Sequence, residues 1–577
     1  MNEIFLKDFW CKKNIYWILL ISIIFFHFIN NIYFLFKYPL PEGKDSVAHI
    51  TTFLNFSQII KNGSMHPFYI PGRSWLFNLV FIVLDYPPFF YFVAFLINLL
   101  MGQIFLQAAL FTASLFFVLL IISIYKIGAI FGRSTGILAA FICSFYPAIF
   151  LTSRHFSLEL ALCAMVSLGI WLLLKTKFFK SLFYSVMLGI ILGLGQLTKQ
   201  TFFLYISGPL IISIGFFYIQ NWKFKKFIEI RNMVFCCIVF LCISGIFYWS
   251  KDIYISAFNR AQFMGAVKDM DIFSPQHLTY YFRSLRDTMG NFFIAIFLFS
   301  LFFFDFKNRY YFCLMLLWIL IPVVVFSCVV LKYGEYSIPY LPAFALVSAA
   351  GIQNIKNKYF KVLLISLIFF IGVINYFSIS YSRTKMYYST YHASNPRTNI
   401  VRMGTPHSFF QKTFVSWQDV LKEIDNSINI VGVFYDDLRF SFPHYFMRTS
   451  FSYTRKRAQI IDFFFRPTTF LRHLDKFNYI IFITCSNKQW IDKESWDNFI
   501  DKFNRENFTK ICYETSDEKN IVTAEMSFGK SSIIISKKIS EELINLNQMF
   551  LKVYEIDFCV GKKSHSFEKV YIYKRRP

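Results

Sequence analysis

Four short segments of this sequence combine titratable side chains at spacings that could support chemistry. In the first, Asp45 and His49 lie one turn apart on the same face if the segment is helical. A partly buried carboxylate can accept a proton from an attacking hydroxyl, and a neighbouring imidazole can orient that carboxylate or share a metal ion with it. A solvated amphipathic helix has the same spacing, so this pair alone leaves both interpretations open.

The second segment, Ser153–Glu159, places three charged or titratable groups within one short stretch. His155 and Glu159 repeat the four-residue spacing, which again brings an imidazole and a carboxylate onto one helical face. Arg154 carries a planar fork of N–H donors that suits a phosphate group. Helix capping and interfacial snorkelling are the structural alternatives.

The third and fourth segments each place a lysine next to a long apolar run. Lys199 ends the sequence Leu-Thr-Lys and could bind a lipid-linked phosphate as a point charge. Lys332 and Tyr336 belong to a segment in which Gly334 favours a tight turn, so both could face one side. A snorkelling lysine and a capped turn are the corresponding structural interpretations.

The composition indicates which kind of structure holds these four segments. Of 577 residues, 56% are hydrophobic and 16% are charged, whereas soluble proteins have about 45–50% apolar and about 25% charged residues. Many apolar runs approach the roughly 20 residues that span a bilayer core. We therefore predict an all-α polytopic membrane domain with about eleven transmembrane helices. The expected spans are Ile15–Phe36, Phe105–Ile124, Gly136–Thr152, Leu160–Leu174, Leu182–Leu197, Phe202–Ile219, Met233–Trp249, Phe292–Phe304, Phe312–Leu331, Ile338–Ile352 and Phe360–Tyr381.

The net charge of +25 is explained by topology, since the basic residues lie between apolar runs, and we expect no nucleic-acid partner. Loops rich in Lys and Arg stay on the cytoplasmic side. These loops alternate along the chain at Lys12/Lys13, Lys126/Arg133, Lys175/Lys177/Lys180, Lys223/Lys225/Lys226/Arg231, Lys307/Arg309 and Lys356/Lys358/Lys361. The N-terminus is therefore predicted to be cytoplasmic, and all four chemical segments fall on the outer face. The first apolar run is too long for a signal peptide and is expected to be retained.

Two regions outside the spans have their own organisation. In the first outer loop, Lys37–Gln103, an apolar stretch is broken by Asp85-Tyr86-Pro87-Pro88, which favours helices lying at the membrane interface. The tail, residues 382–577, alternates helix-like and strand-like runs and is predicted to be a small α/β domain on the non-cytoplasmic side, after a transmembrane catalytic domain of residues 1–381. Strands are expected at Ile428–Tyr435, Tyr479–Ile483 and Val570–Tyr573.

The order of the motifs resembles the GT-C superfamily of polyprenyl-phosphate-dependent glycosyltransferases, over roughly residues 10–380. Its members include the protein O-mannosyltransferases, the aminoarabinose transferases and the Rgt-like membrane glycosyltransferases. The matching stretches are Asp45–His49 after the first span, the Tyr-Pro-Pro stretch Tyr86–Tyr91, the hairpin Tyr146–Glu159, the glycine-rich run Gly189–Lys199 and the turn Tyr336–Pro342. Two positions depart from the pattern: Glu335 stands where the family has Arg, and the second acidic residue is Glu159 where Asp is also common.

This resemblance implies an inverting transfer of a sugar from a polyprenyl-phosphate donor to an acceptor hydroxyl at the outer, periplasmic face. The retained first span and the simple loops suit a bacterial inner membrane. The partners would be that donor, membrane lipids and a lipid, glycan or protein acceptor. The resemblance implies no certain cofactor and leaves a divalent metal ion open. It assigns Asp45 as general base, Glu159 as a second catalytic carboxylate, His49 and His155 as orienting the acceptor or a metal, and Arg154, Lys199, Lys332 and Tyr336 as binding the donor phosphate.

Two other functions compete with this hypothesis. A polysaccharide polymerase or ligase would use a lipid-diphosphate donor and basic outer loops, and the loop Ser250–Asn291 carries several basic residues, among them Arg260, Lys268, Arg283 and Arg286. A transporter or flippase would place titratable groups near the middle of the membrane and show internal repeats. His27 is the only clear mid-span titratable residue, and the sequence shows no repeat, which makes the transporter the weaker alternative.

Overall fold

The computed structural model describes most of the N-terminal two thirds of the chain and seven strands of the remainder. The described residues are 2–37, parts of 49–60, 86–102, 105–220, 227–248, 275–306, 309–328 and 334–381, together with the strands. The chain forms two compact units, Met1–Pro406 and His407–Pro577. The catalytic role of the first unit and the location of the second stay predictions.

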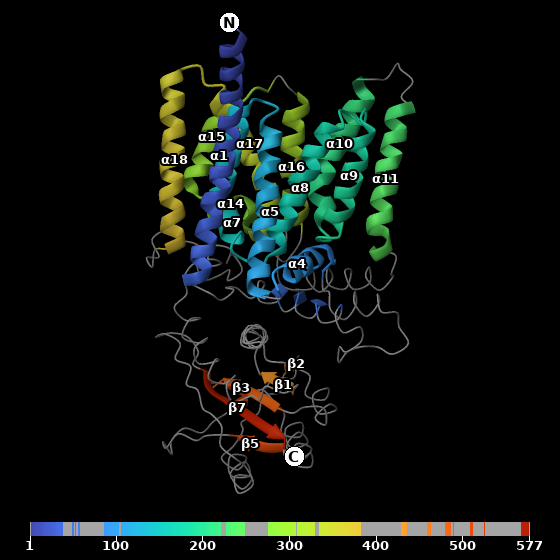
Figure 1. The fold of residues 1–577 in the computed structure, drawn as a ribbon, viewed down its shortest axis with the longest axis vertical. Helices are drawn as coiled ribbons and strands as arrows, with labels where there is room; N and C mark the ends of the chain where they lie inside the picture. The colour runs from blue at the N-terminus through green and yellow to red at the C-terminus, as the bar shows by residue number, and fades with distance from the viewer. Residues whose placement is uncertain are drawn as a thin grey trace. The chain divides into compact units, whose positions relative to one another are not determined.

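The first unit is a bundle of helices (Figure 1). Seven described helices, α1, α5, α8, α10, α11, α16 and α18, are long and apolar enough to cross a membrane. Every predicted span coincides with a helix or a helix pair, so the polytopic all-α architecture is confirmed. The bounds are α1 Asn2–Lys37, α4 Phe89–Leu100, α5 Phe105–Gly128, α6 Arg133–Ser144, α7 Pro147–Thr152, α8 Leu158–Lys175, α9 Leu182–Gln196, α10 Phe202–Gln220, α11 Phe227–Tyr248, α13 Pro275–Leu278, α14 Tyr280–Met289, α15 Asn291–Leu301, α16 Arg309–Ser327, the 3₁₀ helix η1 Gly334–Tyr340, α17 Leu341–Gln353 and α18 Lys358–Tyr381.

Two predicted spans are shorter and more irregular than expected. The predicted span Gly136–Thr152 is divided into α6 and α7 because Tyr146 adopts an extended conformation (φ −65°, ψ 129°) before Pro147, the first residue of α7. A residue that precedes proline is driven out of the helical region in this way. The predicted span Ile338–Ile352 begins as the 3₁₀ helix η1, which contains Pro339, and only then becomes α17. Both irregularities fall beside predicted chemical segments.

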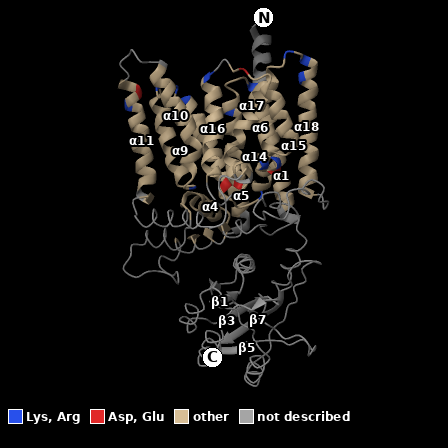
Figure 2. Cartoon of the chain, turned by 180° about the vertical axis from the view of Figure 1, so that it is seen from behind, with Lys and Arg blue, Asp and Glu red and all other residues tan. Residues whose placement is uncertain are grey.

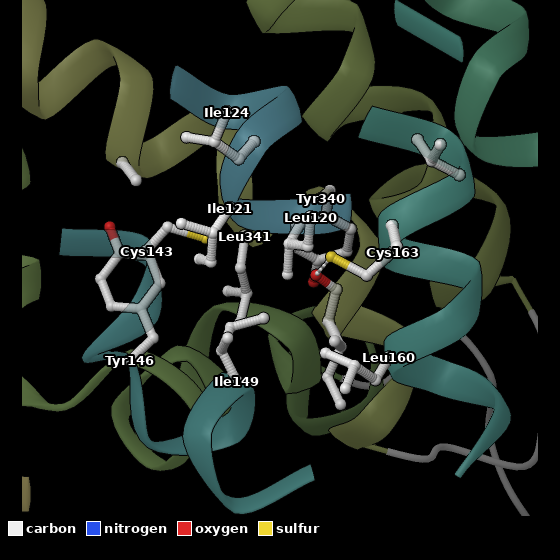
Figure 3. Close-up of a cluster of buried hydrophobic side chains, with 14 of the residues drawn as sticks. Leu120, Ile121, Ile124, Cys143, Tyr146, Ile149, Leu160, Cys163, Tyr340 and Leu341 are labelled. Carbon is white, nitrogen blue, oxygen red and sulfur yellow. Dashed lines mark hydrogen bonds between the residues drawn. The ribbon is translucent and has the colours of Figure 1, made fainter. Parts of the chain in front are cut away.

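The core of the bundle holds these irregular segments in place. Cys163 in α8 lies against η1, and its Sγ donates a hydrogen bond to the Ile338 carbonyl over 3.3 Å. Small side chains at such points let helix and turn approach closely, so the position of η1 relative to α8 is fixed by packing. Figure 3 shows this cluster, in which the buried side chains come from α5, α6, α7, α8, η1 and α17: Leu120, Ile121, Ile124, Cys143, Tyr146, Ile149, Leu160, Cys163, Tyr340 and Leu341.

The short apolar helix α4 lies across the ends of the longer helices (Figure 1). Its first residue makes a tertiary hydrogen bond, in which the Phe89 N–H donates to the Leu197 carbonyl over 2.9 Å. This bond connects the Tyr-Pro-Pro stretch to the end of α9. α4 is the part of the first outer loop that is described as a continuous helix, and its location at the membrane interface stays a prediction.

The second outer loop is more structured than predicted. Its described part folds into α13 and α14, and α14 buries Tyr280, Tyr281, Ser284 and Thr288 along one face. This spacing is helical, with Phe282 and Arg286 outside. Because residues 250–291 are polar in composition, this amphipathic helix is not predicted from the sequence.

Charge is distributed unequally along the bundle. In Figure 2, most positions coloured as Lys or Arg lie at the upper ends of helices such as α10, α11, α16 and α18, and few charged positions lie along the middle of the helices. This asymmetry agrees with the orientation expected from loop charges. The assignment of that end to the cytoplasm stays a prediction.

The second unit contains a five-stranded sheet of order β2-β1-β3-β7-β5. β1 pairs in parallel with β2 and β3, and β7 pairs antiparallel with β3 and β5. All three predicted strands are present, and parallel neighbours need crossover connections, which suits the predicted α/β class. The bounds are β1 Asn429–Tyr435, β2 Ala458–Asp462, β3 Tyr479–Cys485, β4 Lys488–Gln489, β5 Phe508–Ile511, β6 Ala524–Glu525 and β7 Phe567–Arg575, with β4 and β6 forming a separate pair.

A glycine contact between α15 and α17 provides a test of this packing. A Cβ atom at Gly351 would overlap the Ser300 carbonyl oxygen, a backbone atom that cannot rotate away. We therefore expect Gly351→Ala to destabilise the bundle by about 1–3 kcal/mol, measured as a lower midpoint of thermal unfolding in detergent. Gly215→Ala in α10 is the matched control, since nothing lies within 4 Å of a Cβ there. Equal midpoints for the two variants would contradict the α15–α17 packing.

Candidate active site

A buried ion pair joins two of the predicted chemical segments. The Lys199 ammonium, between α9 and α10, donates a hydrogen bond to Oε1 of Glu159 in the first turn of α8. The side chains are only 9% and 7% exposed, respectively. Residues 40 positions apart in sequence therefore form one charged unit, as the hypothesis of a common site requires.

Ser157 fixes the other side of the carboxylate. It is the N-cap residue of α8, and its Oγ accepts a hydrogen bond from the Glu159 N–H at 3.3 Å while donating one to Glu159 Oε2 at 2.7 Å. Each carboxylate oxygen of Glu159 thus has one protein partner. Sequence reasoning missed Ser157, although a serine directly before an apolar helical run is a typical N-cap signal.

Aromatic rings surround the lysine. The Lys199 ammonium lies 5.9 Å from the ring centre of Tyr86 and 5.4 Å from that of Tyr336, distances typical of cation–π contacts. The Tyr336 ring stacks on Phe326 at 4.6 Å, and its backbone carbonyl accepts a hydrogen bond from Tyr205 at 2.9 Å. The turn η1 is thereby held beside Lys199.

Electrostatics keep this lysine charged. Burial lowers the pKa of the Lys199 ammonium, but the adjacent Glu159 carboxylate, assisted by Glu335, outweighs burial and raises that pKa above its ordinary value. For Tyr336, burial is the largest effect and raises the pKa of the phenol despite the nearby Lys199. At neutral pH the site therefore contains a cation and a neutral phenol that can donate hydrogen bonds.

His49 joins the site from the first outer loop. Its Nδ1 lies 2.8 Å from the Tyr91 hydroxyl, and its ring meets the Tyr86 ring edge-on at 5.1 Å. It also interacts electrostatically with Glu159. Since Tyr86 contacts both His49 and Lys199, three predicted segments meet around this ring. The predicted residues Asp45 and Lys332 lie outside the described part of the chain.

Arg154 occupies a different environment. Its Nε donates to Asn31 Oδ1 at 3.2 Å and its Nη2 to Ser380 Oγ at 2.8 Å. The guanidinium also lies 4.7 Å from the ring centre of Phe34 and 4.9 Å from that of Tyr376. These contacts connect the α7–α8 turn to α1 and α18, whereas the Lys199 site is built from α8, η1 and the end of α9. These contacts hold the α7–α8 turn in place, and the predicted role of Arg154 in phosphate binding stays a prediction.

His155 is buried beside Arg154. Neither of its ring nitrogens has a hydrogen-bond partner in the described part of the protein, and the side chain is 3% exposed. Burial, with the positive charge of Arg154 adding to it, lowers the pKa of His155 to about 3. The imidazole is therefore neutral at physiological pH. Within the described residues, no group of three or more His, Cys, Asp or Glu side chains could hold a metal ion.

Both the sequence around this site and the fold are similar to those of known glycosyltransferases. Residues 85–249 match the sequence model of the dolichyl-phosphate-mannose-protein mannosyltransferases, and this segment contains Glu159 and Lys199. The fold is similar to that of ArnT from Cupriavidus metallidurans, solved bound to undecaprenyl phosphate, with a TM-score of 0.54 at 10% identity over 96% of this chain and 97% of that chain. The chain therefore has the GT-C fold of ArnT, and its segment 85–249 is similar to a family of membrane mannosyltransferases. The resemblance inferred from the motifs is thereby confirmed.

Other similarities of this chain are weaker. The archaeal oligosaccharyltransferase AglB from Archaeoglobus fulgidus, solved with an inhibitory peptide and a dolichol-phosphate, has a TM-score of 0.45 at 10% identity. That alignment covers 96% of this chain and 88% of AglB, and its score supports no further conclusion. No curated protein sequence matches this chain.

The buried Glu159–Lys199 ion pair predicts a specific pattern of stability. Lys199→Gln leaves the Glu159 carboxylate buried without its cation and should destabilise the protein by about 3–5 kcal/mol. The double variant Glu159→Gln/Lys199→Gln removes both charges and should recover most of that loss. Thermal unfolding of purified protein in detergent would measure both. A double variant no more stable than Lys199→Gln would show that the lost charge pair is not the cause.

The buried imidazole predicts a dependence on pH. Since the pKa of His155 is lowered to about 3, the unfolded chain binds a proton as pH falls below about 6.5 while the folded protein does not. Folding stability from this group is therefore present above pH 6.5 and is lost as pH falls toward 3. His155→Gln should make the fall in stability between pH 7 and pH 5 smaller by on the order of 2 kcal/mol. Parallel pH profiles of unfolding for variant and wild type would contradict this.

Proposed function

We propose that this protein is a membrane glycosyltransferase that transfers a sugar from a polyprenyl-phosphate donor to an acceptor hydroxyl at the outer face of a bacterial inner membrane. The observation that carries the proposal is the buried Glu159–Lys199 pair flanked by Tyr86 and Tyr336. It offers a cation for a lipid-linked phosphate beside a carboxylate for a hydroxyl. The similar ArnT was solved with undecaprenyl phosphate, which supports this class of donor.

Lys199 and Tyr336 would bind the donor phosphate. An ammonium has three N–H donors, and Glu159 takes one of those of Lys199. The ring of the neutral Tyr336 phenol lies 5.4 Å from the Lys199 ammonium, which places it beside the same phosphate. In a buried site both interactions are stronger than in water, and they would stabilise the negative charge that grows on the phosphate as the sugar leaves. The predicted contribution of Lys332 belongs to the same proposal.

Asp45 would act as the general base. It precedes His49 by four residues in the sequence, and His49 is part of the site through Tyr86 and Tyr91. The acceptor oxygen would attack the anomeric carbon as its proton moves to Asp45, and the bond between that carbon and the phosphate oxygen would break. A single displacement of this kind inverts the anomeric centre. Glu159 would orient the acceptor hydroxyl as a hydrogen-bond acceptor.

The orientation of the chain is a further part of the proposal. The gathering of Lys and Arg at the upper ends of the helices in Figure 2 supports a cytoplasmic location for that end of the bundle. Glu159, at the start of α8, and Lys199, after α9, lie at helix ends opposite the basic loops. The site would then face the periplasm. We propose residues 1–381 as the catalytic domain and 382–577 as a periplasmic domain.

A donor assay on purified protein in nanodiscs tests this proposal. Sugar transfer should occur from polyprenyl-monophosphate sugars and not from polyprenyl-diphosphate sugars. Asp45→Asn should lower the rate about 10²- to 10⁴-fold, since a general base contributes a factor of this size. Glu229→Gln, at the other end of the bundle in α11, is the control and should be fully active.

Two outcomes would contradict the proposal. Transfer from the diphosphate donor alone would favour the polymerase or ligase alternative. Near wild-type activity in a folded Asp45→Asn protein would remove Asp45 from the role of base while leaving the class of donor intact.

A further inference from the structure

The hydrogen bonds of the Glu159–Lys199 pair show how it would respond to a second anion. Oε2 of Glu159 is held by Ser157 at 2.7 Å, and Oε1 is held by Lys199. The Lys199 ammonium has no other hydrogen-bond partner in the described structure, so two of its N–H groups are unused. Glu159 and a bound phosphate would therefore both depend on the same cation.

We propose that Lys199 is shared between Glu159 and the donor phosphate, so that Glu159 and the donor compete for Lys199 and Glu159 becomes available to the acceptor only after the donor has bound. This inference rests on the proposed function, because it takes the ligand to be a polyprenyl monophosphate. It adds an order of binding to the reaction.

Charge and burial make the competition strong. Glu159 and Lys199 are nearly enclosed, so water screens their interactions poorly. One ammonium can neutralise one carboxylate, and Glu335 already adds a second negative charge near Lys199. A phosphate that enters this group adds at least one more negative charge. The repulsion is relieved if the Lys199 ammonium moves toward the phosphate and away from Oε1.

The released carboxylate would remain in place. Ser157 still holds Oε2, and the Glu159 N–H still donates to the Ser157 Oγ. Only Oε1 would lose its partner, and it could then accept a hydrogen bond from an acceptor hydroxyl. Before donor binding, the Lys199 ammonium neutralises the charge on that oxygen, so an acceptor hydroxyl would bind it only weakly. The donor would therefore bind first.

Binding of undecaprenyl phosphate to the full-length protein in nanodiscs tests the competition directly. Glu159→Gln keeps the side-chain shape and removes the competing charge, so it should bind undecaprenyl phosphate about tenfold more tightly than the wild type. Undecaprenol, which lacks the phosphate, should bind both proteins equally. Glu159→Gln/Lys199→Gln should lose the gain, and Glu229→Gln should bind like the wild type.

The outcomes separate this inference from the proposed function. If wild type prefers undecaprenyl phosphate to undecaprenol but Glu159→Gln binds it no more tightly, the sharing of Lys199 is wrong and the donor class stands. If the double variant keeps the tenfold gain, Lys199 is not the shared cation. If wild type does not distinguish undecaprenyl phosphate from undecaprenol, the proposed donor itself is wrong.

Discussion

The candidate site depends on one constraint: a buried carboxylate and a buried ammonium in an apolar helical bundle are stable only if they pair with each other. Moving either charge out of water costs several kcal/mol unless the partner is present with good geometry. The pairing of Glu159 with Lys199 therefore links the first turn of α8 to the turn after α9. The Ser157 cap and the hydrogen bond between Phe89 and Leu197 hold these two turns.

Irregular backbone makes this convergence possible. The 3₁₀ helix η1 replaces regular helix with a short turn next to Lys199, and the break before Pro147 interrupts the helix that precedes α8. Non-helical backbone is tolerated at membrane depth only where protein covers it, because its polar groups need partners. Here the cover comes from aromatic packing, such as Tyr336 on Phe326 and Tyr146 on Phe293. The packed aromatic side chains thus hold these segments in place, and some of their backbone polar groups are not used in helical hydrogen bonds.

The neighbouring residues Arg154 and Glu159 show how the same turn serves two purposes. The Arg154 guanidinium donates hydrogen bonds to Asn31 in α1 and to Ser380 in α18 and so connects these two helices. Glu159, five positions later, interacts with Lys199. Proximity in sequence suggested one common phosphate-binding group, whereas helix geometry sends the two side chains to different neighbours.

The sequence by itself determined the multi-span architecture, the strands β1, β3 and β7, and the segments that carry Glu159 and Lys199, because hydrophobic run length and charge placement are local properties. It could not reveal that α14 is a buried amphipathic helix, that Ser157 holds Glu159, or that Tyr86 joins His49 to Lys199. Those features depend on which turns meet at the end of the bundle. Only the tertiary structure decides this, because contacts between residues such as Glu159 and Lys199 are set by the packing of helices far apart in the chain.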